Sequence, residues 1–458
     1  MQAGHIIGII IVFIMMGLME IISTKRVKSA KDFEKSGGKA GAALVMGAMM
    51  GTFIGAQATV GTAQMGYIYG MAGVWYTFGG AIGFLVMCFL YVVPLRRSDH
   101  TTIMELISEE YGPASEVLGS VLSSIGMLIS SVSGVLGTTA LLMSLFGWSF
   151  SASCIAASLF ACVYVEAGGL VGAGNVGKLK LVLLFFLSFI SIVAVLRASG
   201  GIGEGTLLPI DLSTLFARGV GKETVNGLAT VAGVIGTQTY VQSVWSAKDD
   251  RTARKATVLA GGLCIPIGLA GTLVGIFMGS QGMLAATEAG KAYPMFIMTR
   301  LPSLLGGLCL GGLLITTVTG SGGLVLGIST IFVRDVLGKL TKRELDERAR
   351  LRASRITIAV IMTGMCLASL ALPGTLMNDL GFLSMGLRAT IVMVPMTLAL
   401  FFPGRFRPKA VLAAMIAGPA ALIAAQLTGV LGAPLLAGTA VSLLTCVLGS
   451  LGAGKTNL

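Results

Sequence analysis

Residues Gly51 to Gly61, with the sequence GTFIGAQATVG, interrupt an apolar run that otherwise has the composition of a membrane-spanning helix. The stretch combines glycines with threonine and glutamine side chains, which weaken a plain hydrophobic span. Inside hydrocarbon every backbone N–H and C=O group must be hydrogen-bonded, so a weakened helix is tolerated only where protein or a water-filled cavity receives the freed groups. The sequence therefore predicts a broken helix at a binding site.

The rest of the chain has the composition of an all-α, polytopic membrane protein. Of its 458 residues, 55% are hydrophobic and 11% are charged, and the mean hydropathy is +0.90, which excludes an ordinary soluble globular protein. The basic residues that give the net charge of +12 lie between apolar runs, so they favour a positive-inside topology over a nucleic-acid partner. The expected partner is the lipid bilayer, and nothing in the sequence indicates an oligomeric state.

Runs of about twenty apolar residues, the length that crosses a bilayer core, predict thirteen spans. The first lacks a basic leader and a cleavage site, so a retained span is favoured over a signal peptide. The predicted limits are 5–23, 41–66, 70–94, 115–146, 150–166, 178–199, 225–243, 256–280, 302–330, 356–372, 380–401, 410–428 and 432–452.

The loops predict the orientation of these spans. With the N-terminus outside, the inner loops and the C-terminal tail hold 26 of the 32 Lys and Arg residues. We therefore expect a multi-pass cell-membrane protein with its N-terminus outside and its C-terminus in the cytoplasm. The loop from Arg334 to Arg355 is expected to form either a short amphipathic cytoplasmic helix or a solvated connector.

A second irregular stretch lies five spans after the first. Residues 232–240 (AGVIGTQTY) again combine glycines with hydroxyl and amide groups, and this span crosses in the opposite direction. Paired interrupted helices in corresponding positions of two halves are typical of inverted-repeat transporters with a site at the bilayer midplane. The alternative is that the glycines only pack against neighbouring helices.

Five further segments follow one another in a familiar order. They are residues 66–76 (GYIYGMAGVWY), 102–112 (TIMELISEEYG), 164–170 (YVEAGGL), 241–255 (VQSVWSAKDDRTARK) and 301–308 (LPSLLGGL). Together they resemble motifs of the sodium:solute symporter family, which includes bacterial proline and sugar symporters. The third is similar to the family's Y-x-x-x-G-G-L signature, and the resemblance covers roughly residues 20 to 400.

The resemblance implies a leucine-transporter-type fold with two inverted five-helix repeats, alternating access, and sodium as the coupling ion in most members. The division it implies is a peripheral helix and loop at 1–40, a first repeat at 41–200, an external loop at 201–224, a second, inverted repeat at 225–402, and two peripheral helices at 403–458.

The resemblance also places an ion site between the first break and the ninth span, with no organic cofactor. The transferred sodium-site positions are Gly51, Ile54, Thr316, Thr319 and Gly320. Thr319 keeps one of the family's two hydroxyls, whereas Gly320 lacks the other, which leaves Ser321 or a water as the substitute. Backbone carbonyls and hydroxyls suit sodium because they are hard oxygen ligands without a full charge.

Two further departures from the family pattern concern charge. Lys178 and Lys180 stand where the family has a T-D-x-x-Q segment, and in some related proton-coupled transporters a lysine takes the place of the sodium ion. One hypothesis is that Lys178 or Lys180 fills or modulates the ion site and weakens sodium dependence; the alternative is that both extend to the cytoplasmic interface. Phe53 replaces the acidic residue that proline-type members carry.

Candidate solute-binding side chains lie on the two irregular spans and on a late span. On the irregular spans they are Gln57, Gln64, Thr237, Gln238 and Tyr240. Arg388 is the one charge well inside a late span, and it either binds a carboxylate-bearing solute or pairs structurally with Asp379 or backbone carbonyls.

The sequence thus predicts a cation-coupled symporter of a small organic solute, with sodium favoured as the ion and a carboxylate favoured over a sugar. Proton coupling, sodium independence, and a membrane sensor without transport are the alternatives. No nucleophile motif or ligand cluster points to an enzyme.

Overall fold

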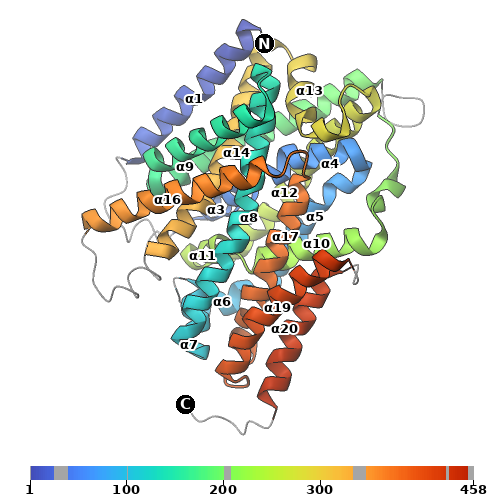
Figure 1. Cartoon of the computed structure of the whole chain (residues 1–458). Coiled ribbons are helices and arrows are strands. Elements are labelled where there is room, and N and C mark those ends of the chain that lie inside the picture. The colour runs from blue at the N-terminus through green and yellow to red at the C-terminus, as the bar shows by residue number, and fades with distance from the viewer. Residues whose placement is uncertain are drawn as a thin grey trace.

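A computed structural model describes residues 2–24, 40–98, 100, 102–200, 208–333, 347–429 and 433–451. Within these ranges the chain is almost entirely helical (Figure 1). The first half contains α1 (Ala3–Thr24), α3 (Ala42–Phe53), η2 (Gln57–Gly61), α4 (Thr62–Tyr69), η3 (Gly70–Val74), α5 (Trp75–Val86), η4 (Met87–Tyr91), α6 (Val92–Ser98), α7 (Ile103–Tyr111), α8 (Pro113–Phe146), α9 (Phe150–Ser199) and η5 (Leu212–Phe216). The second half contains α10 (Val220–Ile235), α11 (Gln238–Ser246), α12 (Asp250–Gln281), η6 (Ala286–Lys291), α13 (Ala292–Arg300), α14 (Ser303–Ile331), α16 (Glu347–Leu370), α17 (Met377–Arg388), η8 (Ala389–Met393), α18 (Val394–Phe401), α19 (Pro408–Thr428) and α20 (Pro434–Ser450).

The apolar helices confirm a multi-pass membrane protein. By length and composition, eight stretches of the described residues can cross a membrane, and four shorter apolar helices accompany them. The exact number of spans remains a prediction, as do the orientation of the termini and the division at residues 40, 200, 224 and 402.

The first predicted break is confirmed. Helix α3 ends at Phe53, Ile54 has an extended backbone (φ −80°, ψ 91°), and the chain resumes as a π-helix from Gln57. Hydroxyl groups donate to backbone carbonyls of this irregular stretch: Thr59 donates to the carbonyl of Gly55 at 2.9 Å and Thr62 to that of Thr59 at 2.7 Å. The polar side chains of this stretch are therefore what allow a broken helix in an apolar environment.

The second predicted break is confirmed as well. Helix α10 ends at Ile235, Gly236 and Thr237 leave the helical path, and α11 begins at Gln238. The Thr237 hydroxyl donates to the carbonyl of Gly233 at 2.6 Å. A Cβ on Gly236 would stand 2.7 Å from the carbonyl oxygen of Arg388, so only glycine allows this close backbone approach.

The loop predicted between the fifth and sixth spans is wrong. In the structure one helix, α9, continues from Phe150 to Ser199 through that segment. The segment is rich in glycine but contains no proline, and glycine weakens a helix without removing a backbone donor. Sequence reasoning placed a boundary there because the segment separates two apolar runs, at 150–166 and 178–199, that were each counted as one span.

Small residues set the closest helix contacts. Helices α4 and α12 lie side by side, and a Cβ on Gly275 of α12 would stand 2.2 Å from the carbonyl oxygen of Ala63. Helix α1 packs on α14 and α9, while α19 packs on α20 next to η8 (Figure 1). None of the seven cysteines forms a disulfide, and five of them are buried among the packed helices. The predicted amphipathic helix lies largely outside the described residues, which resume with α16 at Glu347.

Candidate solute and ion site

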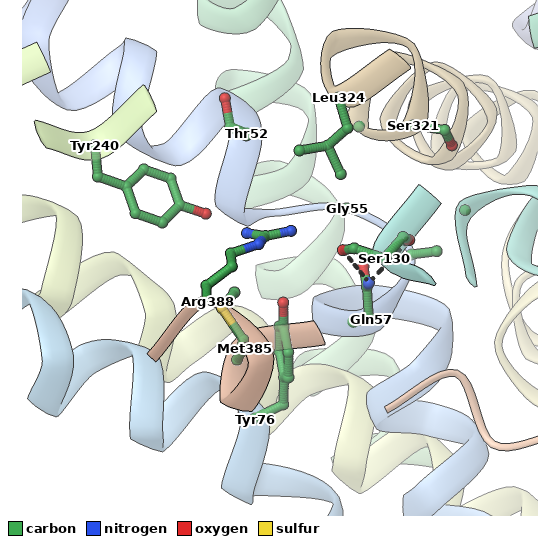
Figure 2. Close-up of a pocket in the computed structure, with 13 residues that line it drawn as sticks. Thr52, Gly55, Gln57, Tyr76, Ser130, Tyr240, Ser321, Leu324, Met385 and Arg388 are labelled. Atoms are coloured by element: carbon green, nitrogen blue, oxygen red, sulfur yellow. Dashed lines mark hydrogen bonds between the residues drawn. The ribbon is translucent and has the colours of Figure 1, made fainter. Parts of the chain in front are cut away.

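A buried pocket lies where the first break faces α8, α14, α17 and the segment after the second break (Figure 2). Most of its lining side chains are hydroxyl, amide, aromatic or apolar, and one is charged. The lining residues are Thr52, Gly55, Ala56, Gln57, Tyr76, Ser130, Gly134, Tyr240, Gly320, Ser321, Leu324, Met385 and Arg388. Three of the predicted solute-binding residues, Gln57, Tyr240 and Arg388, thus come together in one place.

Arg388 is the charged group of this pocket, and its side chain is almost fully buried, with 3% of its surface exposed. Its guanidinium donates from Nη1 to the Thr237 hydroxyl at 3.2 Å and from Nη2 to the Ser384 hydroxyl at 3.0 Å. The Nε–H has no partner, and no ion pair in the described part of the chain includes Arg388. Arg388 therefore holds a buried positive charge with only neutral partners.

The predicted alternative partner of Arg388, Asp379, is engaged elsewhere. Its carboxylate accepts a 2.6 Å bond from Nη1 of Arg218, which lies just before α10. Arg218 also makes a two-pronged pair with Glu223, at 2.7 and 3.0 Å. The alternative of an Arg388–Asp379 pair is therefore wrong, because α17 places the two residues at opposite ends of the helix.

Two tyrosines form a wall beside the guanidinium. Figure 2 shows the hydroxyl ends of Tyr76 and Tyr240 turned toward Arg388. Phe53 lies behind them, stacked on the Tyr76 ring at 5.3 Å between centroids and edge-on to the Tyr240 ring at 6.3 Å. Phe53, at the position where the resemblance implies an acid in proline-type members, therefore packs against two phenol rings.

Gln57 belongs to the pocket and is anchored to α8. Its Nε2 donates to the carbonyl oxygen of Ser130 at 3.2 Å and to the Ser130 hydroxyl at 2.9 Å (Figure 2). These bonds fix the side chain just after the first break. Gln57 thus joins the irregular part of the second span to α8 at the edge of the pocket.

The other predicted solute-binding residues have different surroundings. Thr237 does not line the pocket itself, but its hydroxyl accepts a hydrogen bond from the Arg388 guanidinium, which does. Gln64 uses its amide to hold the start of α17, bonding to the carbonyl of Thr375 at 3.2 Å and to the N–H of Met377 at 3.0 Å. Gln238 accepts a 2.8 Å bond from the N–H of Ile103, at the start of α7. Neither Gln64 nor Gln238 lines the pocket.

The structure adds residues that sequence reasoning missed. Tyr76 and Ser130 line the pocket, and Ser384 holds the guanidinium. Tyr76 stood in a motif used only for family resemblance, and Ser130 lies in a serine-rich part of α8 that offered a signal of a polar helix face. Ser384 stands four residues before Arg388, the spacing at which helix neighbours share a face.

The predicted ion-site residues lie on two elements that touch. Gly320 of α14 faces the first break, since a Cβ on Gly320 would stand 3.2 Å from Cα of Gly55. Thr316 donates its hydroxyl to the carbonyl of Gly312 at 2.7 Å, and Thr319 donates to that of Thr316 at 3.4 Å. The Ser321 hydroxyl, the proposed substitute, donates to the carbonyl of Thr317 at 2.8 Å and lines the pocket. Ile54 is fully buried at the break.

Lys180 reaches the carbonyl side of this predicted ion site. Its ammonium donates to the carbonyl oxygen of Gly51 at 2.8 Å, and its side chain is 1% exposed. It therefore does not extend to a membrane interface. Among the described residues it forms no ion pair. The side chain of Lys178 lies outside the described residues.

Two broken helices that meet at a buried polar pocket inside a bundle of apolar helices define a membrane transporter of the leucine-transporter type. The chain belongs to the sodium:solute symporter family, whose model matches residues 36–418.

Similar proteins agree with this assignment. A curated relative, an uncharacterized symporter of Bacillus subtilis, is 23% identical over 77% of this chain and 72% of its own length. The substrate-bound, outward-open structure of a Na+-coupled sialic acid symporter has a TM-score of 0.78, with 16% identity over the whole of both chains. An inward-facing structure of the transporter Mhp1 has a TM-score of 0.60, with 12% identity over 90% of each chain. These structures show the fold, and Mhp1 itself is described in both a closed and an inward-facing conformation.

Proposed function

We propose that this protein is a secondary active transporter that carries a small carboxylate-bearing solute together with a cation by alternating access. The observation that carries the proposal is Arg388, a buried guanidinium in the central pocket with hydroxyl partners and a free Nε–H. Arginine stays charged in proteins, so it cannot escape the cost of burial by losing a proton. A carboxylate offsets that cost with charge and with paired hydrogen bonds.

Sodium is the first candidate for the coupling cation. The family is named for it, and a structural neighbour is described as Na+-coupled. The break after Phe53 brings an irregular stretch of backbone, with its carbonyl oxygens, close to Gly320 and Ser321 of α14. Oxygen ligands of this kind fit sodium, and Gly320 supplies no hydroxyl of its own.

The test of the solute proposal uses purified protein in two assays. In a thermal-shift screen against carboxylates, amino acids and sugars, with and without sodium, only ligands of the folded state raise the melting temperature. We expect carboxylates to do so in the wild type and in Arg388→Lys, which keeps the charge. Arg388→Gln should lose the shift and abolish uptake into vesicles while still folding and inserting. Unchanged transport by Arg388→Gln would refute the proposal.

A second candidate for coupling rests on the bond between Lys180 and Gly51. An ammonium on this carbonyl stands where the resemblance places sodium. A buried lysine, unlike a buried arginine, is able to release its proton, which suits proton coupling or sodium-independent transport. The two candidates predict opposite responses to the same change of salt.

The experiment that separates them replaces sodium by choline during uptake. Sodium coupling predicts that uptake collapses in choline and that Lys180→Gln changes nothing, which would rule out a role for the lysine in coupling. The lysine hypothesis predicts that uptake persists in choline, follows a proton gradient, and loses that gradient dependence in Lys180→Gln. Arg96→Gln, at the partly exposed Asp250 pair, serves as a control for removal of a cation.

A further inference from the structure

The charges around the central pocket are of one sign. Among the lining residues Arg388 is the charged one, and no carboxylate joins it there. Lys180 adds a second buried cation next to the pocket, because it binds the carbonyl of Gly51 and the following residue, Thr52, lines the wall. The described acidic side chains that form ion pairs do so with other partners, away from this site.

The pocket has few uncharged polar groups, and most of their donors already bond to other protein groups. The Gln57 amide donates to the carbonyl and hydroxyl of Ser130, and the Ser321 hydroxyl donates to the backbone of α14. The hydroxyls of Tyr76 and Tyr240 face the guanidinium, so they are placed to contact the same group that Arg388 binds (Figure 2). Phe53 fixes both rings from behind and brings no acid to the wall.

This arrangement suits a carboxylate and opposes an ammonium. A carboxylate accepts from the free Nε–H and from the phenol hydroxyls, and it neutralises a buried charge. An ammonium on the adjacent carbon has no carboxylate to pair with, and it stands beside a fixed guanidinium of like charge. Juxtaposed like charges in a desolvated site are strongly unfavourable, and such contacts set specificity by exclusion.

Building on the proposed function, we propose that the pocket selects carboxylates that carry no ammonium group: simple or hydroxylated organic acids, and not amino acids. With an arginine and no carboxylate among its lining residues, the site suits a net anion and not a zwitterion. Solute and coupling cation then enter with compensating charges.

Pairs of isosteric ligands test this inference on the wild-type chain. Glycolate and glycine, lactate and alanine, and longer 2-hydroxy and 2-amino acids of equal skeleton differ only in hydroxyl versus ammonium. Dissociation constants are measured with purified protein by calorimetry or thermal shift, with lactamide as the uncharged control. We expect each hydroxy acid that binds to do so at least ~100-fold more tightly than its amino acid.

The outcomes separate this inference from the proposal beneath it. If carboxylates bind in an Arg388-dependent way but alanine equals lactate within about threefold, the site accepts an ammonium and only this inference fails. If lactamide binds as well as lactate, or no carboxylate of the series binds, the carboxylate proposal fails and this inference fails with it.

Discussion

Arg218 links the loop before α10 to the start of α17, and replacing it by glutamine gives the sharpest stability prediction. The Arg218 side chain is 6% exposed and that of Glu223 is fully buried, whereas Asp379 is 38% exposed. Although burial opposes the charged form, the bonds to Glu223 and the charge of Asp379 raise the pKa of Arg218 above its usual value. Arg218→Gln leaves the Glu223 carboxylate buried without a counter-charge, which costs about 3–5 kcal/mol.

Replacing Asp379, the other carboxylate that pairs with Arg218, should lower the stability far less. Asp379→Asn removes a partner that water already screens, so we expect a loss of about 0–1 kcal/mol. A double variant, Arg218→Gln with Glu223→Gln, replaces the unpaired charge by two neutral amides and should recover most of the loss. The measurement is unfolding of the purified protein in detergent, by heat or denaturant, for all four proteins. Equal losses in Arg218→Gln and Asp379→Asn, or no recovery in the double variant, would refute the reasoning.

Three further changes test the packing and the site. Gly275→Ala should lower the melting temperature, because its Cβ would stand 2.2 Å from the carbonyl oxygen of Ala63. Gly262→Ala on the same helix, where nothing lies within 4 Å, should be neutral or stabilising by up to ~1 kcal/mol. Equal melting temperatures of the two variants would contradict the packing. Gly320→Ser, made in a Lys180→Gln background, restores a hydroxyl beside the first break, where the lysine no longer occupies the Gly51 carbonyl. Sodium should therefore raise the melting temperature of this double variant more than that of Lys180→Gln alone. An equal or smaller effect of sodium on the double variant would argue against an ion site there. Phe53→Ala empties the space behind Tyr76 and Tyr240 and should cost about 3–5 kcal/mol as well as weaken carboxylate binding; wild-type affinity would show that the rings need no such support.

The two breaks could be predicted because their cause is local. Glycines that weaken a helix and hydroxyls that donate to its backbone carbonyls occur within ten residues of each other, as Gly55, Thr59 and Thr62 do. The family signal was predictable for the same reason, since each motif is a short run. The continuity of α9 was not predictable, because the sequence gives no measure of how far a glycine-rich helix continues.

The site was predicted only in part because its contacts join distant segments. Arg388 was found from the rarity of charge in a span, but its partner Thr237 comes from the second break, and that contact depends on how the break packs against α17. Gln64 has the composition of a solute ligand, and only the position of Met377 shows that its amide is used to hold α17. Lys180 bonds to Gly51, 129 residues away, because α9 packs against α3. No local feature of the sequence around either residue predicts this contact.

The measurement that tests the central claim most directly is uptake of a labelled carboxylate into proteoliposomes containing the full-length chain. With an inward sodium or proton gradient, we predict accumulation above the external concentration, and loss of that accumulation when the gradient is collapsed or when Arg388 is replaced by glutamine. Binding without uptake would mark the protein as a sensor of the same fold. Uptake that never exceeds equilibrium under either gradient would contradict cation-coupled symport.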